Sequence, residues 1–306
     1  HVVLIAGKRG SGKSYTIGVI AEELADLETE VKKNIATLIF DTMGIFWTMK
    51  YKNEKEKLLL SEWKLKSRNL PVKIWAPYGY FEEYEKRQIP VDGKFALKAS
   101  ELEIEDWLLT FDLKITDTIS VLIERVLTKL KEEKEDYGIE DIIERIKKQD
   151  GETKETINAV SALFEAALSW KVFAKKGQKG TKINELIEAG KTSVMDLSVY
   201  SSVGAFNVRA LVIGFISRKL FNERMLARKK EEMQAVQHGV DYLSFKQERE
   251  MPLVWIFIDE CLTGGTEIIT DKAHTPIQDI VKRFENGEKF KVFGFDKESD
   301  SYGHYD

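Results

Sequence analysis

The sequence predicts an α/β protein built around a parallel sheet, and three observations lead to this fold class. An apolar run at residues 2–6, which predicts a parallel strand buried on both faces, leads into a glycine-rich motif and then into a segment with helical apolar spacing. Further apolar runs alternate with helical segments, which is the pattern of a parallel sheet with crossover helices. Residues 81–189 break this alternation with mainly helical patterns, so we expect a helical insertion there.

Composition limits the class of protein. The chain has 306 residues, of which 43% are hydrophobic, and no apolar run is long enough to span a bilayer, so no membrane association is expected. The net charge of −4 predicts that any contact with a polyanion comes from local patches. A single cysteine excludes a disulfide framework and favours the reducing cytoplasm. Because the chain begins at His1 and stops at Asp306 inside a patterned segment, we expect a fragment.

The glycine-rich motif spans residues 7–14 and reads Gly-x-x-x-x-Gly-Lys-Ser. Its glycines let the backbone fold around a phosphate with several N–H groups aimed at the oxygens. In such a motif Lys13 reaches the β- and γ-phosphates of ATP, and the Ser14 hydroxyl is a ligand of Mg²⁺. The helix that follows directs its N-terminus at the same phosphates. A chance glycine turn is the alternative, but strand, motif and helix occur in the required order.

A pair of acids follows the last long apolar run, at residues 253–258. Beside a phosphate-binding motif, Asp259 is expected to hold Mg²⁺ through water opposite Ser14, and Glu260 to polarise the attacking water. The alternative is a buried strand whose end merely reaches solvent. An adjacent pair of acids after an uninterrupted apolar run favours the catalytic interpretation.

Three further strands are expected at residues 34–44, 70–79 and 191–200. Asp41 and Asp196 fall near the ends of the first and third, at the carboxyl edge where ligands bind in such sheets. Both are equally well interpreted as turn or capping residues. Residues 203–233 form a long amphipathic helix, and one of its arginines is a candidate to stabilise transferred phosphate in a neighbouring subunit. Salt bridges on the helix surface are the alternative, and we select no arginine.

Several segments together resemble the HerA/FtsK-type ATPases, and most closely the archaeal HerA-like branch. They are HVVLIAGKRGSGKSYTIGVIAEEL, TLIFDTMGIF, SVMDLS with the helix after it, and VWIFIDE, covering about residues 1–260. The resemblance implies a RecA-like core that forms a homo-hexameric ring, moves double-stranded DNA with ATP and Mg²⁺, and works with a NurA-type end-processing nuclease. It also implies that Asp259 serves Mg²⁺ and that Glu260 is the catalytic glutamate. The implied nucleotide-binding residues are Gly7, Gly10, Ser11, Gly12, Lys13, Ser14 and Tyr15.

The chain departs from that family after Glu260, and residues 261–306 resemble the N-terminal block of an intein. The resemblance implies the start of an all-β Hint domain. Its first residue, Cys261, would attack the carbonyl of Glu260 and convert the amide to a thioester. A short alternating strand at TEIIT and a hairpin-like Asn286-Gly287 pair fit this interpretation. In the alternative, Cys261 is an ordinary residue of the motor.

The two resemblances lead to an expectation about activity. Splicing needs a downstream histidine block, a terminal asparagine and a nucleophile beyond it, so this chain alone is expected not to splice. The motor would be interrupted as well, so we expect weak or no turnover with nucleotide binding retained. Three function classes follow: a DNA translocase interrupted by an intein, a P-loop ATPase acting on another substrate, and a nucleotide-binding scaffold without catalysis.

Overall fold

The chain divides into two compact units, His1–Asp259 and Glu260–Asp306, and each is described by itself. The structure is a computed structural model. It describes residues 2–5, 10–200, 206–237, 251–259, 267–270, 273–276, 279–280, 282–283, 286–289, 291–296 and 301–305. Among these residues, no helix combines the length and apolar character that crossing a membrane requires.

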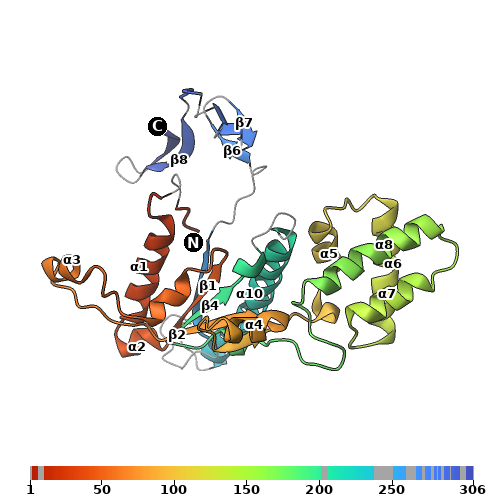
Figure 1. Cartoon of the computed structure of the whole chain (residues 1–306), viewed down its shortest axis with the longest axis horizontal. Helices are drawn as coiled ribbons and strands as arrows, with labels where there is room; N and C mark the ends of the chain where they lie inside the picture. The colour runs from red at the N-terminus through yellow and green to blue at the C-terminus, as the bar shows by residue number, and fades with distance from the viewer. Residues whose placement is uncertain are drawn as a thin grey trace. The chain divides into compact units, whose positions relative to one another are not determined.

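A five-stranded parallel sheet organises the first unit (Figure 1). The strand order is β3-β2-β4-β1-β5. The strands are β1 (Ile35–Asp41), β2 (Val72–Pro77), β3 (Gly93–Phe95), β4 (Thr192–Asp196) and β5 (Leu253–Ile258). β1 lies between β4 and β5, with Asp41 opposite Asp196 and Phe40 opposite Ile258. The carboxyl ends of these three strands therefore meet at one edge of the sheet.

Four of the predicted strands are present in the structure, and the strand predicted at the N-terminal apolar run is not. β1, β2, β4 and β5 fall within the predicted ranges, which confirms the α/β class with a parallel sheet. Residues 2–5 form no strand, and Val2 is 99% exposed, so the prediction of a buried strand there is wrong for these residues. An apolar run shows what a strand is able to bury, but a strand also needs a neighbouring backbone, and no strand of the described residues pairs with this run.

Helices and short 3-10 turns connect the strands. The α-helices are α1 (Lys13–Ala25), α2 (Thr29–Lys32), α3 (Lys57–Glu62), α4 (Phe81–Lys86), α5 (Ile104–Thr110), α6 (Thr118–Glu133), α7 (Ile139–Lys147), α8 (Lys154–Ser169), α9 (Ile183–Leu186) and α10 (Phe206–Gln237). The 3-10 turns are η1 (Phe46–Lys50), η2 (Tyr78–Tyr80), η3 (Ala99–Glu101) and η4 (Ser198–Tyr200).

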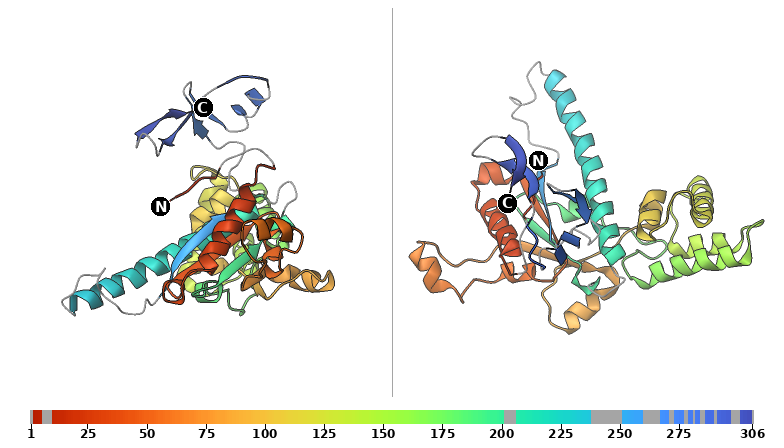
Figure 2. Two further views of the ribbon diagram at one scale, coloured as in Figure 1. Left: turned by 90° about the vertical axis from the view of Figure 1, so that its left-hand side faces the viewer. Right: turned by 90° about the horizontal axis from the view of Figure 1, so that it is seen from above.

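Both faces of the sheet are covered by helices. Successive residues of β1 point to opposite faces, so this strand packs against both layers. Ile39 packs with Ile17 of α1 on one face, whereas Leu38 and Phe40 pack with Val212 of α10 on the other. Figure 2 shows α1 and α10 on opposite sides of the sheet. Burial on both faces explains why β1 is almost continuously apolar in the sequence.

The helices α5 to α8 form a group with a strongly aromatic core (Figure 1). Trp107 is fully buried and its ring lies 4.9 Å from that of Phe164 and 5.5 Å from that of Phe173. The predicted helical stretch at 81–189 differs from the structure in one respect, because it contains β3, which pairs with β2. β3 has only three residues and lacks an apolar run, so the sequence gives no strand signal there.

The second unit contains two small antiparallel sheets among its described residues. One pairs β6 (Glu267–Ile269) with β7 (His274–Pro276), and the other pairs β8 (Val292–Asp296) with β9 (Ser301–Tyr305). The strand predicted at TEIIT is therefore confirmed as β6. The Asn286-Gly287 pair does not form a hairpin. It closes a helical turn, since the backbone N–H of Asn286 donates to Lys282 and that of Glu288 to Arg283.

Candidate active site

The described residues that lead into α1 include two glycines in the left-handed backbone region. Gly10 and Gly12 have φ values of 81° and 89°, a region that favours glycine because it lacks Cβ. Gly12 is the N-cap of α1, and neither a side-chain cap nor an acidic residue occupies the first turn. The first N–H groups of a helix have no partner within the helix, and they suit a phosphate. The sequence therefore builds a positively polarised helix end beside Lys13.

Ser14 and Asp259 meet at this helix end. The Ser14 hydroxyl donates to Oδ1 of Asp259 over 3.1 Å, although the two residues are 245 positions apart. Ser14 lies in the first turn of α1, and Asp259 directly follows β5 and is buried. Mg²⁺ is commonly held in proteins by one or two carboxylates together with phosphate oxygens and water. A hydroxyl and a carboxylate in contact, beside a glycine cradle, fit this type of site.

The backbone of Asp259 is held by the neighbouring strand β1. Its N–H donates to the carbonyl of Phe40 over 3.3 Å. Its carbonyl accepts a hydrogen bond of 3.1 Å from the hydroxyl of Thr42, which is fully enclosed in the protein. Thr42 was not among the residues that the sequence singled out. Its signal in the sequence is a hydroxyl placed directly after the last residue of a strand, Asp41, at the sheet edge where ligands bind.

The carboxylate of Asp41 accepts hydrogen bonds from the turn that follows β1. Its Oδ1 accepts hydrogen bonds from the backbone N–H groups of Met43 and Gly44, and its Oδ2 accepts one from Phe46. Gly44 has a φ of 69°, and a Cβ there would come within 2.7 Å of the Ser198 hydroxyl oxygen. The turn after β1 therefore requires both an acceptor at Asp41 and a glycine at Gly44.

Asp41 and Asp196 form a buried acidic pair at the same sheet edge. Burial raises the pKa of Asp41 to about 6, and the nearby charge of Asp196 adds to this effect, while the three backbone N–H groups oppose it. Asp196 accepts a hydrogen bond from the backbone N–H of Ser198. Burial also raises the pKa of Tyr84, which is close to the pair. The structure thus assigns both aspartates to turns, which was one of the two interpretations open from sequence.

The other predicted site residues fall into two groups. Lys13 is partly buried at the start of α1, whereas Ser11 and Tyr15 are exposed beside it. Gly7, Glu260 and Cys261 lie outside the described residues.

Three arginines of α10 form ion pairs. Arg218 donates to both carboxylate oxygens of Asp106 over 2.8 and 2.6 Å, which ties α10 to α5. Arg224 pairs with Glu231, and Arg228 pairs with Glu232 one turn along the same helix. For these three residues the salt bridges expected from sequence are found, although the Arg224–Glu231 pair is largely buried rather than on the surface.

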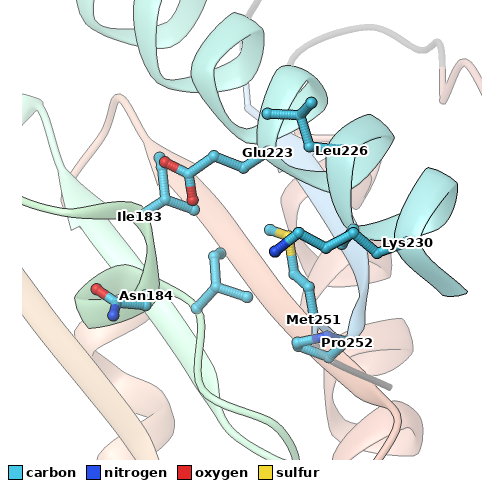
Figure 3. Close-up of a pocket in the computed structure, with 9 residues that line it drawn as sticks. Ile183, Asn184, Glu223, Leu226, Lys230, Met251 and Pro252 are labelled. Atoms are coloured by element: carbon cyan, nitrogen blue, oxygen red, sulfur yellow. The ribbon is translucent and has the colours of Figure 1, made fainter.

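A separate cavity of about 310 Å³ lies between α9, α10 and the segment before β5 (Figure 3). Leu226 and Met251 supply apolar surface, and Glu223 and Lys230 supply charge. Burial raises the pKa of the Glu223 carboxyl. Met251 precedes β5 whereas Asp259 follows it, so the cavity lies at the opposite end of this strand from the Ser14–Asp259 contact. It contributes no residue to the candidate site.

Comparison with known families supports the geometric evidence. Residues 1–220 match a family model described as the central domain of the helicase HerA. Comparison with curated proteins gives no match for the chain. The family match covers the glycine-rich loop, α1, β1 to β4 and the first half of α10.

Proposed function

This chain belongs to the HerA helicase central-domain family, and from that premise we propose that it is an ATP-driven motor that translocates double-stranded DNA. Membership of the family makes it a P-loop ATPase in general terms, with a sheet that fits a RecA-like core. The observation that carries the proposal is the Ser14–Asp259 hydrogen bond. Because it joins the phosphate loop to the strand-end acid, it supports a catalytic motor over a scaffold that only binds nucleotide.

Each site residue has a defined task in this proposal. Ser14 and Asp259 hold Mg²⁺, and Glu260 orients and polarises the attacking water. When bound, Mg²⁺ neutralises charge that develops on the transferred phosphoryl group. The residues that hold the nucleotide are Gly7, Gly10, Ser11, Gly12, Lys13, Ser14 and Tyr15.

The proposal extends to assembly and partners through the resemblance to archaeal HerA-like ATPases. We infer a homo-hexameric ring around duplex DNA, a NurA-type nuclease as partner, an archaeal origin and a cytoplasmic location. With a net charge of −4, the chain would contact DNA through local basic patches rather than through a global field.

Nucleotide binding by the full chain tests the site directly. A fluorescent ATP analogue is titrated with Mg²⁺ into the wild type, Lys13→Ala and Lys148→Ala. Lys13→Ala removes a cation from the phosphates, and we expect it to weaken binding by about tenfold or more. Lys148 is a matched control, since its side chain is 68% exposed and pairs with Glu144. Equal affinities for the two variants would contradict the proposed nucleotide site.

DNA dependence separates the proposed translocase from an ATPase that acts on another substrate. ATP hydrolysis by the protein without the intein segment is measured with and without linear duplex DNA. We expect stimulation by DNA, and only weak turnover by the present 306-residue chain. An active ATPase that does not respond to DNA would favour the alternative of a P-loop ATPase that acts on another substrate.

We also propose that an intein begins at Cys261 and that its Hint domain includes residues 261–306. Two observations support this part. The division into compact units falls between Asp259 and Glu260, and the described strands after it are antiparallel and separate from the five-stranded sheet. The thiolate of Cys261 would form a C–S bond to the carbonyl carbon of Glu260. The C–N bond then breaks, and the nitrogen of Cys261 takes up a proton.

Thiol-induced cleavage tests this chemistry. The purified chain is incubated with excess dithiothreitol, which captures a thioester, and its fragments are weighed by mass spectrometry. We expect release of a fragment ending at Glu260 from the wild type and none from Cys261→Ala. An intact wild-type chain, or equal cleavage of both proteins, would count against an intein at this position.

A further inference from the structure

We propose that Thr42 is a positioning residue that sets the orientation of the peptide unit linking the two candidate catalytic acids. This inference rests on the proposed function, because it concerns the same site. It begins from the hydrogen bond of 3.1 Å between the Thr42 hydroxyl and the backbone carbonyl of Asp259.

This hydrogen bond lies directly beyond the end of the ladder between β1 and β5. The ladder between β1 and β5 ends with the pair Phe40 and Ile258. Beyond it, the N–H of Asp259 still donates to the carbonyl of Phe40, and Asp41, the last residue of β1, is paired with Asp196 of β4. The hydroxyl of Thr42 supplies the next link and so extends the attachment of β5 by one residue. Both backbone polar groups of Asp259 are thereby held by β1 and the residues that directly follow it.

The carbonyl of Asp259 belongs to the peptide bond that joins it to Glu260. A peptide unit is planar, so a bond to its oxygen also fixes the direction in which the chain leaves Asp259. The Thr42 hydroxyl therefore acts on the carboxylate of Asp259 through its main chain, and on the acid that follows through the peptide plane. Its bond is to a backbone oxygen, which makes it a positioning residue rather than a catalytic one.

The loop that carries Thr42 is built to be rigid. Asp41 holds three backbone N–H groups of this loop. Gly44 lies so close to Ser198 that a Cβ would be 2.7 Å from the Ser198 hydroxyl oxygen. Thr42 itself is only 2% exposed, so water does not compete for its hydroxyl. A hydroxyl held on a fixed loop defines one position for its acceptor, which is the property that a positioning residue requires.

The test measures how much Mg²⁺ improves ATP binding by the full chain. Thr42→Val removes the hydroxyl and keeps the branched shape, and Thr42→Ser keeps the hydroxyl. Thr37→Val is the matched control, because Thr37 is also buried in β1 and makes no side-chain hydrogen bond that involves Asp259. Dissociation constants are measured with Mg²⁺ and with EDTA. The readout is their ratio, and thermal unfolding of each variant is recorded in parallel.

We expect Thr42→Val to lower the ratio about threefold to tenfold, the effect of losing one hydrogen bond. Thr42→Ser and Thr37→Val should keep the wild-type ratio. If Thr42→Val fails to fold, Thr42→Ser is compared with Thr42→Ala, which differs from it only by the hydroxyl. A wild-type ratio in Thr42→Val or Thr42→Ala overturns the role of Thr42. A wild type that shows no effect of Mg²⁺ overturns the proposed function instead.

Discussion

A buried aspartate lies at the end of two neighbouring strands and directly after a third, but the three carboxylates have different partners. Asp41 and Asp196, at the ends of β1 and β4, accept hydrogen bonds from backbone N–H groups of the turns that directly follow them. Asp259, after β5, accepts a hydrogen bond from Ser14, which is 245 residues away in the phosphate loop. An acid at a strand end is therefore an ambiguous signal. The sequence distance to its partner separates a residue that shapes a turn from one that belongs to a site.

Among substitutions of these three aspartates, we expect the largest effect at Asp259. Asp259→Asn replaces a charged oxygen ligand by a neutral amide, so the stimulation of ATP binding by Mg²⁺ should fall about tenfold or more. Asp196→Asn should leave that stimulation unchanged. Both are measured by titration with and without EDTA. If the two variants lost the Mg²⁺ effect equally, the distinction between turn and site would not hold.

A smaller effect is expected on stability at Asp41. Asp41→Asn places an amide NH₂ or a less basic oxygen opposite the N–H groups of Met43, Gly44 and Phe46, so part of the turn loses its acceptor. We expect the free energy of unfolding to fall by about 1–3 kcal/mol, with the Mg²⁺ effect on ATP binding retained. Urea denaturation measures the first quantity. An unchanged unfolding midpoint would show that the turn does not depend on this carboxylate.

The smallest expected effect is a dependence of stability on pH. The pKa of Asp41 is about 6 in the folded state and 3.8 for an unperturbed aspartate, so between these values the folded state binds more protons than the unfolded state. Its contribution is fully present below pH 4 and is lost as pH rises through about 6. Over any one pH unit the change in unfolding free energy is at most about 1.4 kcal/mol, the equivalent of one pKa unit.

Comparison with Asp41→Asn isolates this contribution from those of other acids. Urea denaturation of both proteins at several pH values between 4 and 7 gives the difference in unfolding free energy. As pH rises, the wild type should lose unfolding free energy relative to the Asp41→Asn variant. A constant difference would mean that Asp41 titrates alike in the folded and unfolded chain.

Much of the first unit could be predicted from the sequence because its strands are buried on both faces. Ile39 and Phe40 belong to different core clusters, yet both lie in one run of mostly apolar residues that predicts a strand without any knowledge of the partner. The same reasoning fails for residues 2–5, since pairing depends on a neighbour that the pattern does not contain. It also fails for β3, whose three residues carry no pattern.

The candidate site shows the same division. The motif ending at Ser14 and the acids after β5 have spacings set by phosphate chemistry, so the sequence names them directly. Thr42 has no such spacing, because its acceptor is a backbone carbonyl 217 residues away. A backbone carbonyl is present at every residue and leaves no trace in the sequence. Such contacts become visible only when the fold brings the two segments together.

The distance along the chain between Ser14 and Asp259 has a consequence for how the motor matures. Contacts between distant segments form after a large loop has closed, which makes them late events in folding. During synthesis, a chain whose β5 has not yet left the ribosome has no aspartate to meet the serine at the start of α1. Tight binding of the nucleotide with Mg²⁺ would therefore require a chain that is complete through Asp259, and shorter nascent chains would not bind it tightly.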